Sequence, residues 1–146
     1  MNAFVIVVIG ILGGLAGAVQ SGSLGVMEER AGTLASTFVT YGLGGLVAGI
    51  AMVVFGGSRF TDIKDIPWWA FSAGIMGVVV VATLGITVSR LGLGAALTLF
   101  TASTLILGAV IDHFGWMSQE RPFDIRKLVG VAVVIFGTWL VVAGDG

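Results

Sequence analysis

The long apolar segments of this chain carry neutral polar side chains rather than charged ones near their centres. An unpaired amide or hydroxyl in hydrocarbon is costly, so each must face another helix, water or a ligand. Serine and threonine have a local alternative, because they often bond a carbonyl of their own helix. Gln20 has no such alternative and is the most polar group well inside a segment. The candidates for contact with a small-molecule substrate are Gln20, Ser36, Thr40, Tyr41, Thr101, Ser103 and Thr104.

A carboxylate and an imidazole stand together at Asp112-His113, where the fourth apolar segment ends. Such a pair near the membrane interface can bind protons or a cation. The favoured alternative is that Asp112 anchors the following loop or pairs with Arg121 or Arg126.

Other kinds of chemistry are excluded by composition. The chain has one histidine and no cysteine, which removes disulfides, thiolate metal sites and a nucleophile–base pair. The glycine-rich run 10–17 follows no strand and is no dinucleotide site. A net charge of −1 argues against nucleic acid as a partner. We therefore expect no enzyme, no cofactor, no metal and no catalytic residue.

The positions of the charges predict the elements that hold these groups. The seven basic and eight acidic residues all lie at the edges of, or between, five long uncharged stretches, and 57% of the chain is hydrophobic. A helix needs about 20 apolar residues to cross the hydrocarbon core, and barrel strands are half that length. We expect an all-α membrane protein with a single domain, 1–146, and transmembrane helices over about 3–25, 33–55, 67–89, 92–111 and 127–143. Without a positive region before the first segment, a cleaved signal peptide is not expected.

An odd number of crossings places the two termini on opposite sides of the membrane. Five basic residues lie on the N-terminal side and two on the other, which favours the N-terminus inside and the C-terminus outside. This margin is modest and leaves insertion in both orientations open. The basic residues counted on the N-terminal side are Arg59, Lys64, Arg121, Arg126 and Lys127, and on the other side Arg30 and Arg90. On the N-terminal side, Trp68 and Trp116 are expected in an interfacial aromatic belt.

Glycine is abundant, with 24 residues, most of them inside the predicted helices. Small residues at four-residue spacing let helix backbones approach closely in lipid. Such faces pack either within one bundle or against a partner copy, and spacing alone does not distinguish the two. The predicted packing glycines are Gly10, Gly14, Gly45, Gly49, Gly74 and Gly77.

Several motifs in order along the chain resemble a known family, the YdcZ-like branch of the drug/metabolite transporter superfamily. The motifs are Pro67-Trp68-Trp69, Gly74 with Gly77, Arg90-Leu91-Gly92, Ile111-Asp112-His113-Phe114-Gly115, and Arg126 with Gly130 and Gly137. The resemblance covers nearly the whole chain. It implies five transmembrane helices, an inner-membrane exporter, and an antiparallel dimer with an inverted copy or an inverted five-helix homologue, whose substrate cavity lies between the copies.

By position, Gln20 matches the helix-one glutamine of this family and Asp112 matches its helix-four aspartate. The sequence departs from the family at Leu24, where an asparagine is common, and at Ser103-Thr104, where Gly-Gln is common. These changes make the expected cavity less polar. The helix-one glutamate of the related small multidrug exporters is absent.

Three functions remain open at this level. The first is a transporter that moves a small, amphipathic compound by alternating access. The second is a non-transporting membrane subunit or assembly partner, in which the glycine faces serve a larger complex. The third is a lipid-linked flippase, which a groove open sideways to the bilayer would favour.

Overall fold

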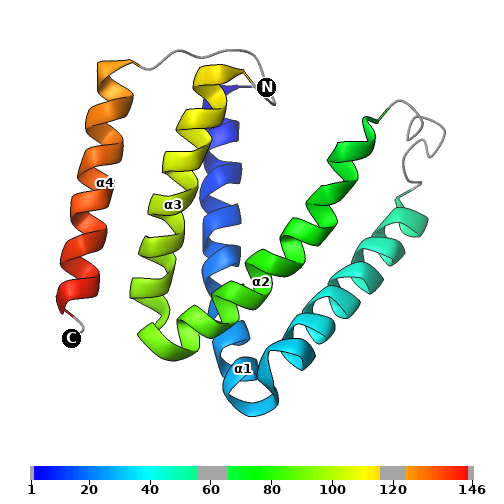
Figure 1. Ribbon diagram of the computed structural model, residues 1–146. Helices are drawn as coiled ribbons and strands as arrows, with labels where there is room; N and C mark the ends of the chain where they lie inside the picture. The colour runs from blue at the N-terminus through cyan, green and yellow to red at the C-terminus, as the bar shows by residue number, and fades with distance from the viewer. Residues whose placement is uncertain (1, 56–65, 116–123, 145–146) are drawn as a thin grey trace. The chain divides into compact units, whose positions relative to one another are not determined.

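The computed structural model describes residues 2–55, 66–115 and 124–144, and every regular element in them is a helix. In chain order the helices are α1 (Ala3–Val54), the short 3-10 helix η2 (Trp68–Phe71), α2 (Ser72–Leu91), α3 (Leu93–Phe114) and α4 (Ile125–Gly144), as Figure 1 shows. The described part of the chain has no strand, so the predicted all-α class is confirmed.

The helix α1 contains a kink at Gly32. Its backbone there has φ 78° and ψ 170°, a conformation that L side chains rarely adopt. The prediction that the first helix ends before Glu28 was wrong, because helix continues through residues 28–31 up to this glycine. An unbroken helix of 52 residues would extend about 78 Å at 1.5 Å per residue, more than twice the hydrocarbon thickness.

The remaining boundaries follow local backbone chemistry. Pro67 has an extended ψ of 135° and precedes η2, so α2 begins at Ser72, later than the predicted 67. A single residue, Gly92, separates α2 from α3, and its φ of 82° again suits only glycine. The helix α3 runs past the predicted end to Phe114, where left-handed Gly115 donates its N–H to the Ile111 carbonyl. The predicted stop at 56–57, the basic loop residues and Trp116 lie outside the described residues.

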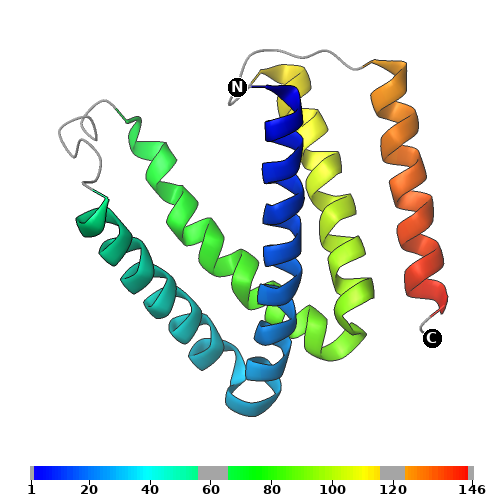
Figure 2. The ribbon, with the colours of Figure 1, turned by 180° about the vertical axis from the view of Figure 1, so that it is seen from behind.

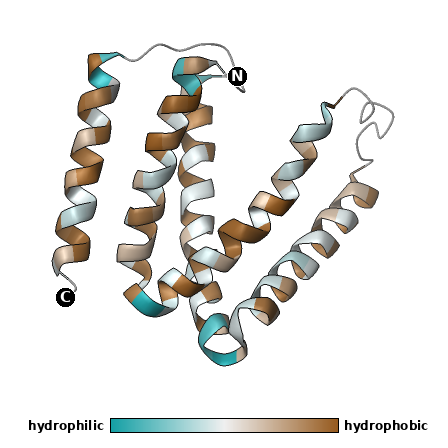
Figure 3. Ribbon diagram, viewed as in Figure 1, coloured by the Kyte–Doolittle hydropathy of each residue, from teal (hydrophilic) through white to brown (hydrophobic). Residues whose placement is uncertain are grey.

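Within the described residues, three helical segments are long and apolar enough to cross a membrane, namely Ala3–Val54, Trp68–Leu91 and Leu93–Phe114. The apolar part of α4, Leu128–Gly144, is shorter and lies at the low end of the usual range of about 17 to 25 residues. Hydrophilic residues concentrate at the α1 bend and near helix ends, while the helix bodies are apolar or neutral (Figure 3).

The chain divides into two compact units, residues 1–18 with 90–146 and residues 19–89. Within the first, α3 and α4 pack side by side and antiparallel, as Figures 1 and 2 show. Within the second, Gly25 of α1 lies against Val88 of α2. Apart from Leu24, Val81 and Val88, the buried side chains are small or polar, whereas most large apolar ones, such as Leu34 (89% exposed), point outward. This distribution is the one expected of helices that face lipid.

Candidate functional site

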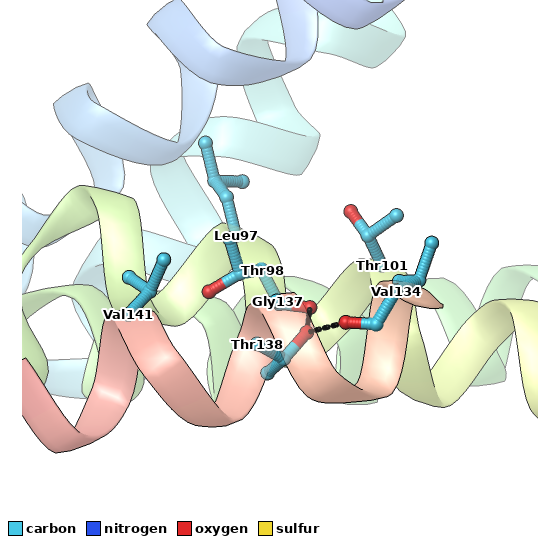
Figure 4. A pocket seen from close by; sticks show the side chains of 7 residues that line it. All are labelled: Leu97, Thr98, Thr101, Val134, Gly137, Thr138 and Val141. Carbon is cyan, nitrogen blue, oxygen red and sulfur yellow. Dashed lines mark hydrogen bonds between the residues drawn. The ribbon is translucent and has the colours of Figure 1, made fainter. Parts of the chain in front are cut away.

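Thr138 of α4 joins the two helices of the first unit. Its side chain is 8% exposed, and its Oγ1 donates to the Val134 carbonyl at 2.8 Å on its own helix. The same hydroxyl reaches the Thr98 carbonyl of α3 at 3.3 Å (Figure 4). An interhelical bond of this kind is worth about 0.6 to 2 kcal/mol in a membrane, so Thr138 fixes the register of α3 against α4.

Two cavities follow one side of this helix pair and share Val134. The first, of about 370 Å³, is lined by Leu97, Thr98, Thr101, Val134, Gly137, Thr138 and Val141. The second, of about 510 Å³, is lined by Thr104, Leu105, Gly108, Ala109, Asp112, Gly130, Val131 and Val134. Their lining residues on α3 recur every three or four positions, which is one face of a helix. We call the two cavities together the α3/α4 groove.

The groove brings together three of the predicted site residues, Thr101, Thr104 and Asp112. Ser103 instead lines a third cavity of about 340 Å³, together with Leu99 and Trp139. One residue step along a helix turns the side chain by about 100°, so Ser103 and Thr104 open on different sides of the pair.

The hydroxyls of these residues differ in how they are used. Thr104 Oγ1 donates to the carbonyls of Phe100 and Thr101 at 3.0 Å each, and Ser103 Oγ donates to the Leu99 carbonyl at 2.9 Å. Both are therefore satisfied by their own helix. The Thr101 hydroxyl makes no such bond within the described chain, which leaves it able to bind a ligand in the groove.

Asp112 lies in the last turn of α3, half-buried, at one end of the groove. The His113 ring beside it makes an edge-on contact with Phe114, with centroids 5.1 Å apart. Arg121, one predicted partner of Asp112, lies outside the described residues. Across the parts of the chain that the structure describes, no group of three His, Cys, Asp or Glu residues is placed to hold a metal ion.

The predicted residues of the second unit form a different arrangement, centred on the α1 bend. Glu28 accepts hydrogen bonds from Thr33 Oγ1 at 2.6 Å and Ser36 Oγ at 3.3 Å. Ser36 is 2% exposed and also donates to the Thr33 carbonyl, and the Ser36 carbonyl accepts from Thr40 Oγ1 at 2.8 Å. These contacts hold the two parts of α1 together across Gly32, and we call them the bend network.

Gln20 and Tyr41 lie outside this network. The Gln20 side chain is exposed and its amide makes no hydrogen bond to any described residue. The Tyr41 ring is 39% exposed and its hydroxyl lies directly against Gly77 of α2. A Cβ at Gly77 would overlap that hydroxyl and lie 3.3 Å from Tyr41 Cζ.

The other predicted packing glycines meet open space. A Cβ added there would find no atom within 4 Å among the described residues, apart from neighbours in its own helix. The glycines of this kind are Gly10, Gly14, Gly45, Gly49 and Gly74. The closest helix contact of the second unit falls instead at Gly25, where a Cβ would lie 2.5 Å from Val88 Cγ1.

Sequence reasoning missed Glu28, Thr138 and Gly25. Glu28 belongs to a charged triplet beyond the predicted end of the first helix at 25. Gly32-Thr33 and then Ser36 follow it, a pattern typical of a chain break with hydroxyls in the next turn. Nothing in the sequence distinguishes Thr138 from other hydroxyl residues in apolar helices. Gly25 is the last residue of the predicted first helix, although it lies seven residues before Gly32 in the same element.

Comparison with known proteins identifies the family. Residues 5–140 match the family described as "Putative inner membrane exporter, YdcZ". No match was found among curated proteins or among solved structures. The match covers most of each of the four α-helices of the described residues, and the apolar segments agree with an integral protein of the inner membrane. The chain therefore belongs to the YdcZ family of inner membrane exporters, within the drug/metabolite transporter superfamily.

Proposed function

We propose that this exporter moves a small amphipathic compound by alternating access, in a cavity formed between two copies of the chain in opposite orientations. Gln20 is the observation that carries the proposal. Its amide is exposed and unbonded within the described chain, in an apolar part of α1. Because an unpaired amide in hydrocarbon is costly, a partner copy, water or a substrate must satisfy it.

The bend in α1 supports five crossings. The parts of α1 before and after Gly32, residues 3–31 and 33–54, each exceed the roughly 20 residues that a crossing needs. With Trp68–Leu91, α3 and the shorter α4, these parts give five segments. Five crossings in one copy make half of an inverted-repeat transporter, which a second, inverted copy completes.

Open glycine faces support a partner. The residues Gly10, Gly14, Gly45 and Gly49 have space for a Cβ within the described chain. Glycine weakens a helix by about 1 kcal/mol relative to alanine, and close approach of another helix offsets this cost in lipid. A second copy of the chain supplies such a helix.

Flux through liposomes tests the role of Gln20. We expect the Gln20→Ala variant to lose at least about tenfold in saturable flux of amphipathic compounds, since about 1.4 kcal/mol of lost interaction is tenfold. Ser23→Ala is the matched control, because Ser23 is also exposed on α1 but donates to the Val19 carbonyl of its own helix. Unchanged flux and unchanged ligand binding in Gln20→Ala would remove Gln20 from the site.

Topology tests the inverted dimer. The chain has no cysteine, so one cysteine introduced after Gly144 can be labelled from either side of the membrane in intact cells. We expect labelling from both sides, which is the signature of a self-pairing inverted dimer. Labelling from one side alone would require a separate inverted partner, and two parallel copies in a crosslinked dimer would refute the arrangement.

The open α3/α4 groove supports a second candidate, a flippase for lipid-linked compounds. A flippase needs a groove that its substrate can enter from the bilayer, and the α3/α4 groove opens at the surface of its unit. Transport of a lipid-linked compound in preference to soluble amphiphiles would favour this candidate.

A further inference from the structure

We propose that the α3/α4 groove is a binding site for a single-chain amphipathic amine. The protonated amino group lies at Asp112 and the hydrocarbon chain extends along the groove toward Thr101. This inference rests on the proposed transport function and names the class of compound that the groove takes.

The polar groups at the Asp112 end of the groove are acceptors. Only Thr104 and Asp112 among the eight residues lining this cavity carry polar side chains. The Thr104 hydroxyl already donates to two carbonyls of its own helix, so it can only accept a hydrogen bond from a ligand. A carboxylate has about four acceptor positions, so Asp112 can take a ligand N–H in addition to any other partner.

The position of Asp112 on its helix also favours a cationic ligand. Asp112 lies in the last turn of α3, where unpaired carbonyls give the helix end a partial negative charge of about half an electron. A cation is favoured at such an end and an anion is disfavoured. No lysine, arginine or histidine is among the lining residues of either cavity. Among the described lining residues, an ammonium group therefore matches this end of the groove, whereas a phosphate or carboxylate finds no basic side chain.

The rest of the groove fits a chain. From Leu97 to Asp112 it follows α3 for about 22 Å at 1.5 Å per residue. Its lining is aliphatic apart from the threonines and Asp112. Three glycines, Gly108, Gly130 and Gly137, keep it open, because a Cβ at each would meet nothing within 4 Å. An aliphatic path of this length suits an extended hydrocarbon chain.

A phospholipid fits less well. Its amine, where present, is joined to a phosphate, and that phosphate would lie close to Asp112 without a donor among the lining residues. The Thr101 hydroxyl could donate, but it lies 11 residues from Asp112, or about 16 Å along the helix. The observations thus favour a free amine over a lipid headgroup.

Photolabelling of the full-length protein in nanodiscs tests the site. The probe is dodecylamine with a diazirine in its chain, which is protonated at neutral pH as lysine is. We expect labelled peptides from α3 and α4, competition by unlabelled dodecylamine, and competition at least about tenfold weaker by dodecanoic acid, which has the same chain with the opposite charge.

Two variants test the two features on which binding depends, the charge of Asp112 and the open space of the groove. Asp112→Asn keeps the shape and removes the charge, and should weaken competition by dodecylamine by about tenfold or more. Gly130→Leu fills the groove from a position where a Cβ meets nothing, and should abolish labelling. The matched control is Gly44→Leu, which also enters open space but lies on α1, and should label as the parent does.

Several results would overturn the inference. They are equal competition by dodecanoic acid, unchanged competition in Asp112→Asn, label mapped outside α3 and α4, or displacement by phosphatidylethanolamine as strong as by the amine. The comparison with dodecanoic acid and the comparison with Asp112→Asn both remain valid if Gly130→Leu fails to fold. If the amine binds as expected but is not transported, transport of this compound fails and the site stands. If the amine does not bind while flux of other compounds depends on Gln20, the site fails and the transport proposal stands.

Discussion

Replacing Gly25 by alanine should push α1 and α2 apart within the second unit. An ideal Cβ at Gly25 lies 2.5 Å from Val88 Cγ1, 3.2 Å from Val88 Cβ and 3.7 Å from the Ser89 backbone nitrogen. Carbon atoms pack at about 3.5 to 4.0 Å, so the overlap is at least about 1 Å. Valine has one strongly preferred rotamer in a helix, and Val88 is 9% exposed, so rotation does not relieve the overlap.

The magnitude follows from two opposing terms. Overpacking costs about 1 to 3 kcal/mol, and alanine gains up to about 1 kcal/mol over glycine in a helix. At Gly44 of α1 only the second term applies, because a Cβ there meets nothing within 4 Å. Gly25→Ala should therefore be less stable than Gly44→Ala by about 1 to 3 kcal/mol.

Equilibrium unfolding in mixed micelles, followed by tryptophan fluorescence, measures this difference. A double-mutant cycle identifies the contact. Val88→Ala removes the overlapping methyl group and should partly restore Gly25→Ala, with a coupling of about 1 kcal/mol or more. Val81→Ala, a similar truncation of a buried valine in α2, should cost the same in both backgrounds. Equal stability of Gly25→Ala and Gly44→Ala, or no coupling to Val88, would refute the close approach.

The remaining predictions concern hydroxyls and a turn. Thr138→Val should lower the free energy of unfolding by about 0.6 kcal/mol or more, because it removes the bond to the Thr98 carbonyl. Thr37→Val should be neutral or stabilising, because Thr37 Oγ1 is buried without a hydrogen-bond partner in the described chain; a larger loss there than at Thr138 would contradict both assignments. Gly92→Ala should cost about 1 to 3 kcal/mol because its φ is 82°, whereas Gly94→Ala, in open space in α3, should cost little in the same unfolding assay.

The helical class and most of the helix positions could be predicted from the sequence, because charge-free length is a direct requirement of the bilayer. The boundaries differ where glycine and proline set the backbone. Helix continues through the charged residues 28–30 because Gly32, and not the charge, breaks α1. The later start of α2 reflects the extended Pro67.

The residue types of the candidate site could be predicted from the sequence, but the hydrogen bonding of each side chain could not. Thr101 and Thr104 are three residues apart and so share one face of a helix, and both line the α3/α4 groove with Asp112. Spacing did not indicate that Thr104 is satisfied by its own helix while Thr101 is not. That difference depends on rotamers and not on residue type.

The sequence by itself determined that this is a helical membrane protein, that its helix interiors hold neutral polar groups, and that its family is one of inner membrane exporters. Only the tertiary structure decided which small residues are in contact. Gly25, Gly77 and Gly85 lie against side chains of the second unit, while Gly10 and Gly45 do not. Apolar residues lie on all sides of these helices, so the periodicity of the hydrophobic residues does not indicate which helix face is buried. The packing of one helix on another is what distinguishes a glycine in contact from a glycine in open space.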